Sequence, residues 1–494
     1  EKAYTMSTSV FVGRQDELER LEALFTKKSA SLVVVRGRRR VGKSRLIERF
    51  SQGKTFFSFS GIPPAEGTNA QLQRDIFAKQ LGNQIGLPGI QSQDWSDLFT
   101  LLARQAQHGR VVILFDEISW MGSLDPTFLG KLKNAWDIEF QKNPNLILIL
   151  CGSVSTWIEK NVISSTAFFG RISLYLTLDE LPLHDCHALL KAQGFLGSMY
   201  ETFKVLSVSG GIPWYISQVQ PKLNADDNIK NLCFRKDGIL FNEFDLIFHD
   251  LFEKRSEIYR PLIEALANGV MEFNEICETL KYQKSGSVSG YLEDLMHSGF
   301  IARDYTWDLK SGKPSRLSHF RLSDNYMRFY LKFIKPNKPK ILQDRFKDSG
   351  IDILPGWRSI LGLQFENLVL KNRTKIWEQL GIKAQDIVAD NPYFQRKTVK
   401  TPGCQIDYLI QTRFNTLFAV EIKFSQAELK IDIVHEMKEK LSRLILPRRF
   451  SCWPILIHVN GVHESIEEAG YFTKIINFGD FLANEDPLKI KHNI

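Results

Sequence analysis

The amino-acid sequence predicts a protein of the α/β class with several domains, and three observations lead to that prediction. A buried strand runs directly into a glycine-rich turn and then a helix around residue 40. Further apolar runs, each about six residues long, follow at intervals and have the length and composition of buried parallel strands. The chain has 494 residues, which is too many for one ordinary core, so at roughly 100–200 residues per domain we expect about three domains.

The composition excludes several classes of protein. The chain is 43% hydrophobic and 24% charged, as in globular proteins, and its apolar runs are far shorter than the roughly 20 residues that span a bilayer. The six cysteines are scattered without a C-x-x-C pair, so neither a zinc site nor a disulfide framework is expected. We therefore expect a cytoplasmic protein with no membrane partner. The net charge of +8 permits binding to nucleic acid but does not by itself indicate it.

The first element is a strand, Ser31 to Arg36, followed by a glycine-rich run and a helix that begins at Ser44. Strand, G-x-x-x-x-G-K-S and helix is the arrangement of a phosphate-binding loop (P-loop), in which backbone N–H groups and the helix N-terminus bind phosphate. Lys43 would reach the terminal phosphates, and Ser44 would ligate Mg²⁺. The sequence therefore predicts ATP and Mg²⁺ as cofactors, bound by Gly37, Arg38, Arg39, Arg40, Val41, Gly42, Lys43 and Ser44.

The second element is a central strand that begins at Val111 and ends in two adjacent acids, Asp116 and Glu117. Asp116 would hold Mg²⁺ through water. Glu117 would orient and polarise the attacking water, which hydrolysis requires and simple binding does not. This pair predicts an ATPase.

Two later strands carry residues that allow two interpretations each. The strand from Asn145 ends at Ser153, whose hydroxyl either contacts the γ-phosphate or the water, or only caps the strand end. Arg171 directly precedes the strand Ile172 to Leu178. It is either an arginine finger or an ordinary surface arginine.

The segment Phe11-Val-Gly-Arg14, the two nucleotide motifs, the Cys151-Gly-Ser153 turn and Gly210-Gly-Ile-Pro213-Trp-Tyr together resemble the archaeal-type ATPases. These form a branch of the AAA+ and signal-transduction ATPase group, and the resemblance covers about residues 8–335. It implies that Phe11 and Val12 pack beside the adenine and that Pro213 lies in a helical lid over the nucleotide. It also implies a finger-type arginine before the fifth strand, which matches Arg171 and predicts a homo-oligomer. The lid lacks an obvious arginine of the ordinary AAA+ kind, which favours a nucleotide-dependent switch over a constitutive ring motor.

The middle of the chain predicts a winged helix. Apolar residues recur at helical spacing in Ile258 to Ala267, Phe273 to Leu280 and Ser287 to His297, and a strand–turn–strand hairpin follows from Gly299 to Ser323. DNA binders of this kind place the second helix in the major groove. The hairpin is basic and the helix contains acids, so the hairpin is better suited to phosphate than the helix is to bases. A structural or protein-binding winged helix is the alternative. The basic residues of the hairpin are Arg303, Lys310, Lys313, Arg316 and Arg321.

A basic, proline-containing linker at residues 336–350 leads to a helix, Trp357 to Lys371, and then to strand, strand, helix and strand. Asp407 and Glu421 lie on short strands 14 residues apart, the distance of a hairpin, and Lys423 shares a face with Glu421. Two carboxylates on paired strands can bind Mg²⁺, and a neighbouring lysine can act on a water molecule. Glu366, on the preceding helix, could complete the site. The alternative is a solvated strand face.

This order of residues resembles the PD-(D/E)XK nucleases over about residues 355–460. The resemblance implies a restriction-endonuclease-like fold, metal ligands at Glu366, Asp407 and Glu421, and catalytic roles for Asp407, Glu421 and Lys423. Nearby basic residues, Arg396, Lys397 and Lys400, would hold a DNA backbone. The site is either an active nuclease or a binding platform.

The predicted architecture is a P-loop ATPase domain at 8–180, a helical lid at 181–250, a winged-helix domain at 251–335, the linker at 336–350 and a nuclease-like domain at 351–494. The expected function is ATP hydrolysis coupled to DNA binding and to metal-dependent DNA cleavage. The alternative is an ATP-dependent switch whose other domains bind DNA or protein without cutting.

Overall fold

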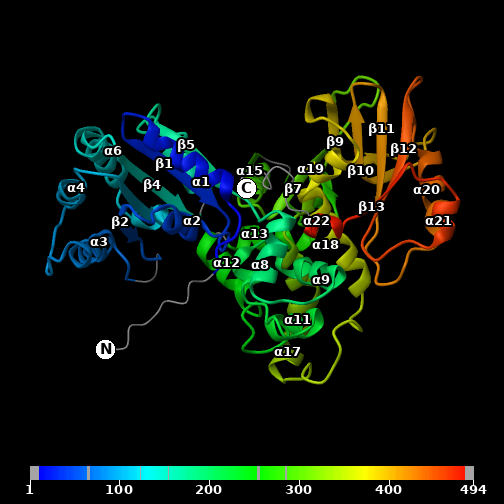
Figure 1. The fold of residues 1–494 in the computed structure, drawn as a ribbon, viewed down its shortest axis with the longest axis horizontal. Helices are drawn as coiled ribbons and strands as arrows, with labels where there is room; N and C mark the ends of the chain where they lie inside the picture. The colour runs from blue at the N-terminus through cyan, green and yellow to red at the C-terminus, as the bar shows by residue number, and fades with distance from the viewer. Residues whose placement is uncertain are drawn as a thin grey trace, which may run out of the picture.

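The computed structural model of the protein describes residues 10–63, 67–122, 124–153, 155–252, 256–283 and 286–483. The outer ends of the predicted architecture, residues 8 and 494, lie outside these ranges. Three sheets organise the chain, with a five-stranded sheet at each side of the view in Figure 1 and helices between and below them.

The N-terminal sheet is entirely parallel, in the order β2-β3-β4-β1-β5. Its strands are β1 (Ser31–Gly37), β2 (Thr55–Ser60), β3 (Val111–Asp116), β4 (Leu146–Gly152) and β5 (Ile172–Leu178). Alternate residues of β1 enter different cores: Leu32 and Val34 pack on one face of the sheet, and Val33 and Val35 pack on the other. The central strands β1, β3 and β4 are apolar because both of their faces are covered, which is why the sequence predicts them well, whereas the edge strands β2 and β5 expose alternate residues.

Helices cover both faces of this sheet. They are α1 (Gln15–Glu22), α2 (Lys43–Phe50), α3 (Ala70–Ile85), α4 (Trp95–Gln105), α5 (Ile118–Gly122), α6 (Phe128–Ile138) and α7 (Ser155–Ile158). Stacked and edge-on aromatic rings from α3, α4 and β3, among them Phe77, Trp95 and Phe115, fill one of the two cores. The helices cover the faces of the sheet, so the loops at the carboxyl ends of its strands can form a binding site.

The predicted lid region is helical. It contains α8 (Leu183–Ala192), α9 (Met199–Ser209), α10 (Pro213–Ile216), α11 (Ala225–Cys233) and α12 (Glu243–Phe252). A capping box of Ser198 and Glu201 begins α9. The predicted boundary at residue 250 falls inside α12, so no break in the helix occurs there.

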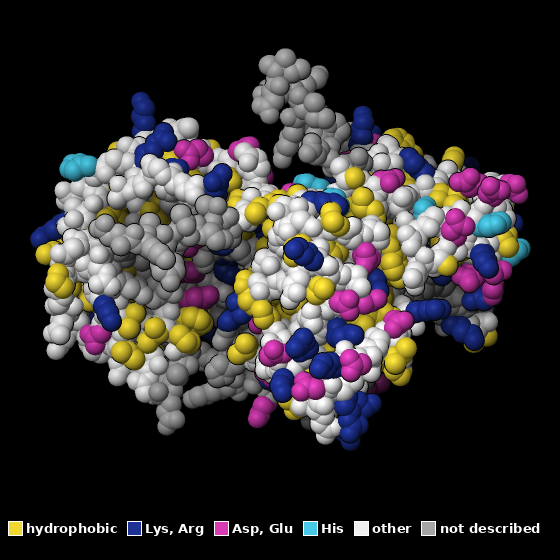
Figure 2. Space-filling model, turned by 60° about the horizontal axis from the view of Figure 1, so that its bottom comes forward, with side chains coloured by type: hydrophobic (Ala, Val, Ile, Leu, Met, Phe, Trp, Pro, Cys, Tyr) yellow, Lys and Arg dark blue, Asp and Glu magenta, His cyan; other side chains and the backbone are white. Residues whose placement is uncertain are grey.

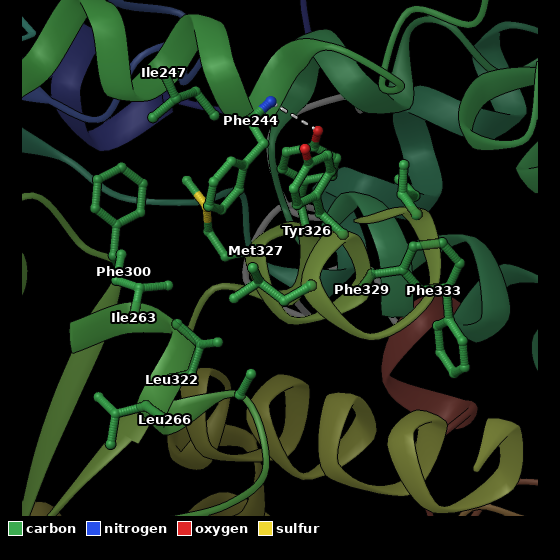
Figure 3. Packing of buried hydrophobic residues seen from close by; sticks show 14 of the residues in the cluster. Phe244, Ile247, Ile263, Leu266, Phe300, Leu322, Tyr326, Met327, Phe329 and Phe333 are labelled. Carbon is green, nitrogen blue, oxygen red and sulfur yellow. Dashed lines mark hydrogen bonds between the residues drawn. The ribbon is translucent and has the colours of Figure 1, made fainter. Parts of the chain in front are cut away.

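The third sheet is antiparallel, with the order β6-β8-β7. Its region contains α13 (Ser256–Leu266), β6 (Met271–Glu272), α14 (Phe273–Thr279), α15 (Gly286–His297), β7 (Ile301–Trp307) and β8 (Pro314–Leu322). Figure 3 shows Phe244 of α12, Ile263 of α13 and Leu322 of β8 in one core, with the Phe244 N–H donating to the Tyr326 hydroxyl at 2.9 Å. Helix α12 therefore packs with the three-stranded region.

The prediction of a basic linker at residues 336–350 is wrong for its first part. Helix α16 (Asn325–Phe329) continues through a π-helical turn, Tyr330–Ile334, into α17 (Lys335–Leu342). Pro336 and Pro339 both lie within this helical run, so neither proline ends it. Ile341 and Phe346 are buried in the central core, so this segment is part of the packed structure.

The C-terminal sheet is mixed, in the order β13-β12-β11-β10-β9. Strand β10 is antiparallel to both of its neighbours, β9 and β11, and β11, β12 and β13 are parallel. The elements are α18 (Trp357–Lys371), α19 (Arg373–Gln379), β9 (Ile387–Gln395), β10 (Cys404–Thr412), β11 (Thr416–Ile422), α20 (Asp432–Arg443), β12 (Ser451–His458), α21 (Glu464–Glu468), β13 (Lys474–Asn477) and α22 (Asp480–Ala483). Helices α18 and α20 cover opposite faces of this sheet.

The β7–β8 hairpin is packed against the C-terminal sheet rather than projecting into solvent. Trp307 and Leu309 are buried in a core with residues of β9, β10 and β11. The Trp307 indole N–H donates to the Gln411 amide oxygen at 2.6 Å. Within the described part of the chain, every helix is too short or too polar to cross a bilayer.

Candidate functional site

The glycine-rich turn after β1 has the conformation that a phosphate-binding loop requires. Gly42 has φ 95°, a region that side-chain-bearing residues rarely adopt, and it begins helix α2. The Lys43 ammonium is buried and donates to the carbonyl oxygens of Gly37 (2.8 Å) and Arg38 (3.0 Å) and to the Ser153 hydroxyl (3.1 Å). Lys43 is thus held at the centre of its own loop.

The predicted ligands of the nucleotide's magnesium ion lie together. The Ser44 hydroxyl donates to a carboxylate oxygen of Asp116 at 2.6 Å, which joins the start of α2 to the end of β3. A hydroxyl and a carboxylate are hard oxygen donors of the kind that Mg²⁺ prefers beside a phosphate. These two residues fit the ion.

Glu117 and Ser153 are also paired. The Ser153 hydroxyl and backbone N–H both donate to the Glu117 carboxylate, at 2.8 Å and 3.2 Å. Glu117 has φ 49°, a left-handed conformation that directs its chain toward the neighbouring strand end. Ser153 therefore stands between the P-loop lysine and the acid predicted to orient water.

A cavity of about 800 Å³ opens beside this group. The predicted nucleotide-binding residues that line it are Phe11, Val12, Arg39, Arg40, Val41, Gly42, Lys43, Ser44, Glu117, Ser153 and Pro213. Trp214 lines it as well, and the Arg40 guanidinium lies 3.7 Å from the centre of the Trp214 ring. The structure therefore gathers these residues around one cavity.

The Arg38 side chain does not point to this cavity, although the sequence placed it with the nucleotide ligands. It forms a buried ion pair with Asp324, at the start of α16, and donates to the Tyr215 hydroxyl at 3.4 Å. A buried guanidinium needs an anionic partner, and Asp324 provides it. Arg40, in contrast, lines the cavity and also pairs with Glu243 of α12 at 3.1 Å.

Arg171 lies away from the cavity. It forms a two-bond ion pair with Asp137 of α6, at 2.8 and 2.9 Å, and this pair lowers the pKa of Asp137 to about 2. Because Arg171 stands at the amino end of β5 and the P-loop follows the carboxyl end of the parallel strand β1, the two lie at opposite ends of the sheet. Arg171 cannot serve the nucleotide of its own subunit.

The second group of predicted residues gathers on β10 and β11. The antiparallel register pairs Tyr408 with Val420, so Asp407 and Glu421 are neighbours across the two strands. Asp407 accepts from the Ile422 N–H at 3.0 Å. The Lys423 ammonium lies 3.1 Å from Glu421 and 3.2 Å from Glu436. The hairpin distance seen in the sequence therefore brings these residues together.

Lys440 of α20 lies between the two carboxylates, and the sequence did not indicate it. Its ammonium contacts Glu421 directly and lies 3.5 Å from Asp407. The Glu421 side chain is only 2% exposed, so its charge is balanced by two lysines rather than by water. This ammonium takes the position between the carboxylates at which a divalent ion would bind.

Glu366, on α18, lies close enough to this pair to be affected by its charge. Burial, and then the Asp407 charge, raise the pKa of Glu366 to about 8. Burial and the Glu421 charge raise the pKa of Asp407 to about 6. Among the residues that the structure describes, no group of three or more His, Cys, Asp or Glu side chains is arranged to hold a metal. In this arrangement Lys440 supplies the positive charge, so Asp407 and Glu421 could hold a divalent ion only if it displaced that ammonium.

The predicted phosphate-binding role of the hairpin is corrected for one residue, Arg321. Arg321 is buried, pairs with Asp304 at 2.8 Å and donates to Asn367 of α18. Its charge is neutralised inside the molecule and is not available to DNA. Arg303 and Arg316 of the same hairpin line a surface hollow.

Arg14 is a further residue that the sequence reading left without a role. It donates to the carbonyl oxygens of Val41 in the P-loop (3.2 Å) and of Asp179 after β5 (2.5 Å). The Phe-Val-Gly-Arg segment, which contains Arg14, is the sequence pattern that could have indicated this role. Lys440, Asp324 and Glu243 carry no such signal, because each is far in sequence from the residues that it contacts.

Comparisons with known proteins agree with the N-terminal site. Residues 11–219 match a family model described as an ATPase domain predominantly from Archaea. An uncharacterized protein of Methanocaldococcus jannaschii is 26% identical over 361 residues, which are 73% of this chain and 76% of that protein. An uncharacterized ATP-binding protein of the same organism is 47% identical over 45 residues, 9% of this chain and 76% of that protein.

The fold has a counterpart among solved structures. A Walker-type ATPase of Pyrococcus abyssi aligns with a TM-score of 0.50 and 18% identity, covering 65% of this chain and 96% of that one. At this identity the likeness concerns the fold alone. Together with the parallel sheet and the P-loop geometry, these comparisons show an α/β P-loop fold, and residues 11–219 match an archaeal-type ATPase domain in sequence.

Proposed function

We propose that this protein binds and hydrolyses ATP with Mg²⁺, and that its nucleotide state controls DNA binding and metal-dependent DNA cleavage at the C-terminal carboxylates. The observation that carries the proposal is a path of buried polar contacts between the P-loop and helix α18. That helix bears Glu366, whose carboxylate is affected by the charges of Asp407 and Glu421.

The nucleotide-site residues would act as follows. Backbone N–H groups of the loop and the Lys43 ammonium bind the β- and γ-phosphates, while Ser44 and Asp116 hold Mg²⁺, which neutralises charge on the phosphates. Glu117 accepts a hydrogen bond from the attacking water. When ATP draws Lys43 to the phosphates, the Ser153 hydroxyl loses one partner and can follow the γ-phosphate. Phe11, Val12 and Pro213 would bound the adenine side of the cavity.

The path to the C-terminal site begins at Arg38, which is ion-paired with Asp324. The next residue, Asn325, donates to the Gln364 carbonyl at 3.2 Å and accepts from the Asn367 amide at 3.0 Å. Arg328 donates to the Gln364 amide oxygen at 3.0 Å. One turn of α16, from Asn325 to Arg328, is thus fastened to the segment of α18 that carries Glu366.

The element order supports the finer domain assignments of this proposal. Helices α13, α14 and α15 followed by the β7–β8 hairpin have the order of a winged helix. A helix with Glu366, then Asp407, then Glu421 and Lys423 on adjacent strands have the order of a PD-(D/E)XK nuclease. DNA is the partner that both assignments favour, and Arg171 favours a homo-oligomer.

A second candidate is an ATP-dependent switch that binds DNA or protein without cutting. The position of Lys440 favours it, because this ammonium already neutralises the pair of carboxylates that a nuclease would use for metal. The two candidates share the ATPase and differ only at the C-terminal site.

The deciding experiment incubates the full chain with single-stranded and supercoiled DNA and Mg²⁺ or Mn²⁺. It is run without nucleotide, with ADP, and with ATP on the Glu117→Gln variant, which we expect to bind ATP and hydrolyse it slowly. Cleavage that depends on the nucleotide and disappears in Asp407→Asn, while ATP hydrolysis persists in that variant, supports the nuclease. Intact DNA in every state, together with a nucleotide-dependent change in DNA affinity, supports the switch. Lys43→Ala, which we expect to lose tight ATP binding, is the control.

A further inference from the structure

Two surface hollows lie side by side where the three-stranded sheet meets the C-terminal sheet. One, of about 670 Å³, is bounded by the starts of α14 and α15 and by β8. The other, of about 640 Å³, is bounded by the end of β9, by β10, β11 and α20, and contains Glu421, Lys423 and Lys440. Arg396, directly after β9, lines both hollows.

The seam beneath these hollows is closed. Strand β7 runs beside β9, the Asn391 amide donates to the Tyr305 carbonyl at 3.3 Å, and the Thr306 hydroxyl donates to the Phe394 carbonyl at 3.4 Å. The His319 and Phe394 rings lie 3.9 Å apart at this seam, one from each sheet. The two hollows adjoin at Arg396, and together they are called the groove; both rings line its part beside β9.

Basic and acidic side chains in the groove are paired with each other. Lys423 pairs with Glu421 and Glu436, Lys440 with Glu421 and Asp407, and Arg443 with Glu439. Arg396 pairs with Glu272, at the N-terminus of α14, across the junction of the two hollows. The basic side chains that line the groove are Arg303, Arg316, Arg396, Lys423, Lys440 and Arg443.

The mixture of aromatic rings and basic groups fits a nucleic-acid strand. Bases stack on aromatic rings whatever their sequence, while arginine and lysine side chains follow the phosphates. The face in Figure 2 has Lys and Arg side chains interspersed with Asp and Glu, so the basic surplus of the chain is not concentrated there. The groove is the part of the surface at which basic groups, rings and the carboxylate site meet.

We propose that this groove binds a single DNA strand, leading from the start of α15 to Asp407 and Glu421, and that Glu272 masks Arg396 until a phosphate replaces it. This inference rests on the proposed DNA binding and identifies its track. Arg396 is exposed, with 62% of its side chain accessible, so it can exchange one anionic partner for another without refolding. Glu272 also caps α14, and glutamine keeps an oxygen that can do the same, so Glu272→Gln preserves the local fold.

The proposed masking predicts that two substitutions change the DNA affinity in opposite directions. Removing Arg396 and removing Glu272 break the same ion pair, yet Arg396→Gln deletes a phosphate contact whereas Glu272→Gln liberates one. We expect Arg396→Gln to weaken binding of a labelled single-stranded oligonucleotide about two- to five-fold, and Glu272→Gln to tighten it by a similar factor, the change that an exposed ion pair corresponds to. In the Arg396→Gln background, Glu272→Gln should have little further effect, because its action passes through Arg396.

The measurement is fluorescence anisotropy on the full chain in EDTA without nucleotide, so that cleavage plays no part. Arg396→Gln should also lower the slope of log affinity against log salt by about 0.7. Glu278→Gln, on an exposed position of the same helix, controls for a general loss of negative charge. Arg413→Gln, which breaks the exposed ion pair with Asp386 beyond the far end of β10, controls for loss of an arginine.

Three outcomes overturn the proposal: both groove variants shifting the affinity in the same direction, either control matching its partner variant, or a preference for duplex over single-stranded DNA. DNA that binds with the expected pattern but is never cut leaves this proposal standing and removes the nuclease. If the DNA is cut but its affinity is unchanged by substitution of Arg396 and Glu272, the groove proposal fails and the nuclease stands.

Discussion

Lys440 shows what a single residue adds that the sequence pattern could not. Asp407, Glu421 and Lys423 were predictable because two short strands at a hairpin's distance place them together. Lys440 lies on a helix beyond β11, and only the packing of α20 on the sheet brings its ammonium to the two carboxylates. Similarly, Arg38 was predicted as a nucleotide ligand from its place in the loop, although Asp324, far along the chain, turns its side chain away.

The first prediction follows from that ammonium. In Lys440→Met the two carboxylates lose the cation between them, and their mutual repulsion makes a divalent ion more favourable at the same place. We expect Mn²⁺ affinity at the nucleotide-free protein to rise about tenfold, equivalent to roughly 1.4 kcal/mol, as measured by isothermal titration calorimetry. Thermal stability should fall in EDTA and recover with Mn²⁺.

Lys438→Met provides the matched control, since Lys438 is on the same helix but lies over the Tyr471 ring. Its Mn²⁺ affinity should equal that of the wild type. Weaker Mn²⁺ binding by Lys440→Met than by the wild type would mean that Lys440 holds the carboxylates in place for the ion instead of competing with it.

At the scale of elements, the sequence was most informative where a strand is buried on both faces, as β1, β3 and β4 are. The parallel strands β1, β3, β4 and β5 and helix α18 occur within a residue or two of their predicted bounds. Strand β9 was missed because Asp390, Asn391 and Pro392 are unusual in strands, and it is tolerated as the edge strand of its sheet. The linker was mistaken for an irregular boundary because proline is rare inside helices, yet Pro336 and Pro339 both lie within α17.

Helix α12 yields the second prediction, because it joins the P-loop to the three-stranded region through Arg40 and Glu243. Arg40→Gln breaks that pair without emptying a core. We expect ATP hydrolysis to stay within about threefold of the wild type. The difference in DNA affinity between the nucleotide-free and ATP-bound protein should fall by about two- to five-fold, the coupling carried by one partly exposed ion pair.

The measurement is DNA affinity by anisotropy, with and without a non-hydrolysable ATP analogue. Arg260→Gln is the control, because it breaks another ion pair of α12, with Asp245 at 3.0 Å, that does not involve the P-loop. Equal coupling in Arg40→Gln and wild type would assign the communication to the Arg38–Asp324 contact alone.

At the scale of the whole molecule, the hydrophobic cores cross the predicted domain boundaries. Lid helices α8, α9 and α10 share a core with α18 and the C-terminal sheet, and Phe203 of α9 packs against Phe365 and Phe478 at ring distances of 5.3 and 5.5 Å. The lid therefore cannot move on the nucleotide without moving its contacts with the C-terminal sheet. This shared core, more than any linker, is the physical basis for expecting the two sites to respond to each other.

The last prediction concerns assembly. Arg171 lies at the amino end of β5, the edge strand of its sheet, and a strand of seven residues separates it by roughly 20 Å from the loop end of that sheet. A guanidinium there can reach a nucleotide only in a neighbouring subunit, after exchanging Asp137 for the γ-phosphate.

We expect specific ATPase activity to rise with protein concentration and to fall about 10³-fold or more in Arg171→Ala. Mixing Arg171→Ala with Lys43→Ala should restore part of the activity, because one shared interface then combines an intact P-loop with an intact arginine. Lys133→Ala, which removes the other cation bound to Asp137, should leave the rate unchanged if Arg171 acts through the nucleotide. A monomer whose rate is independent of concentration, and mixtures without any recovery, would reduce Arg171 to a surface ion pair.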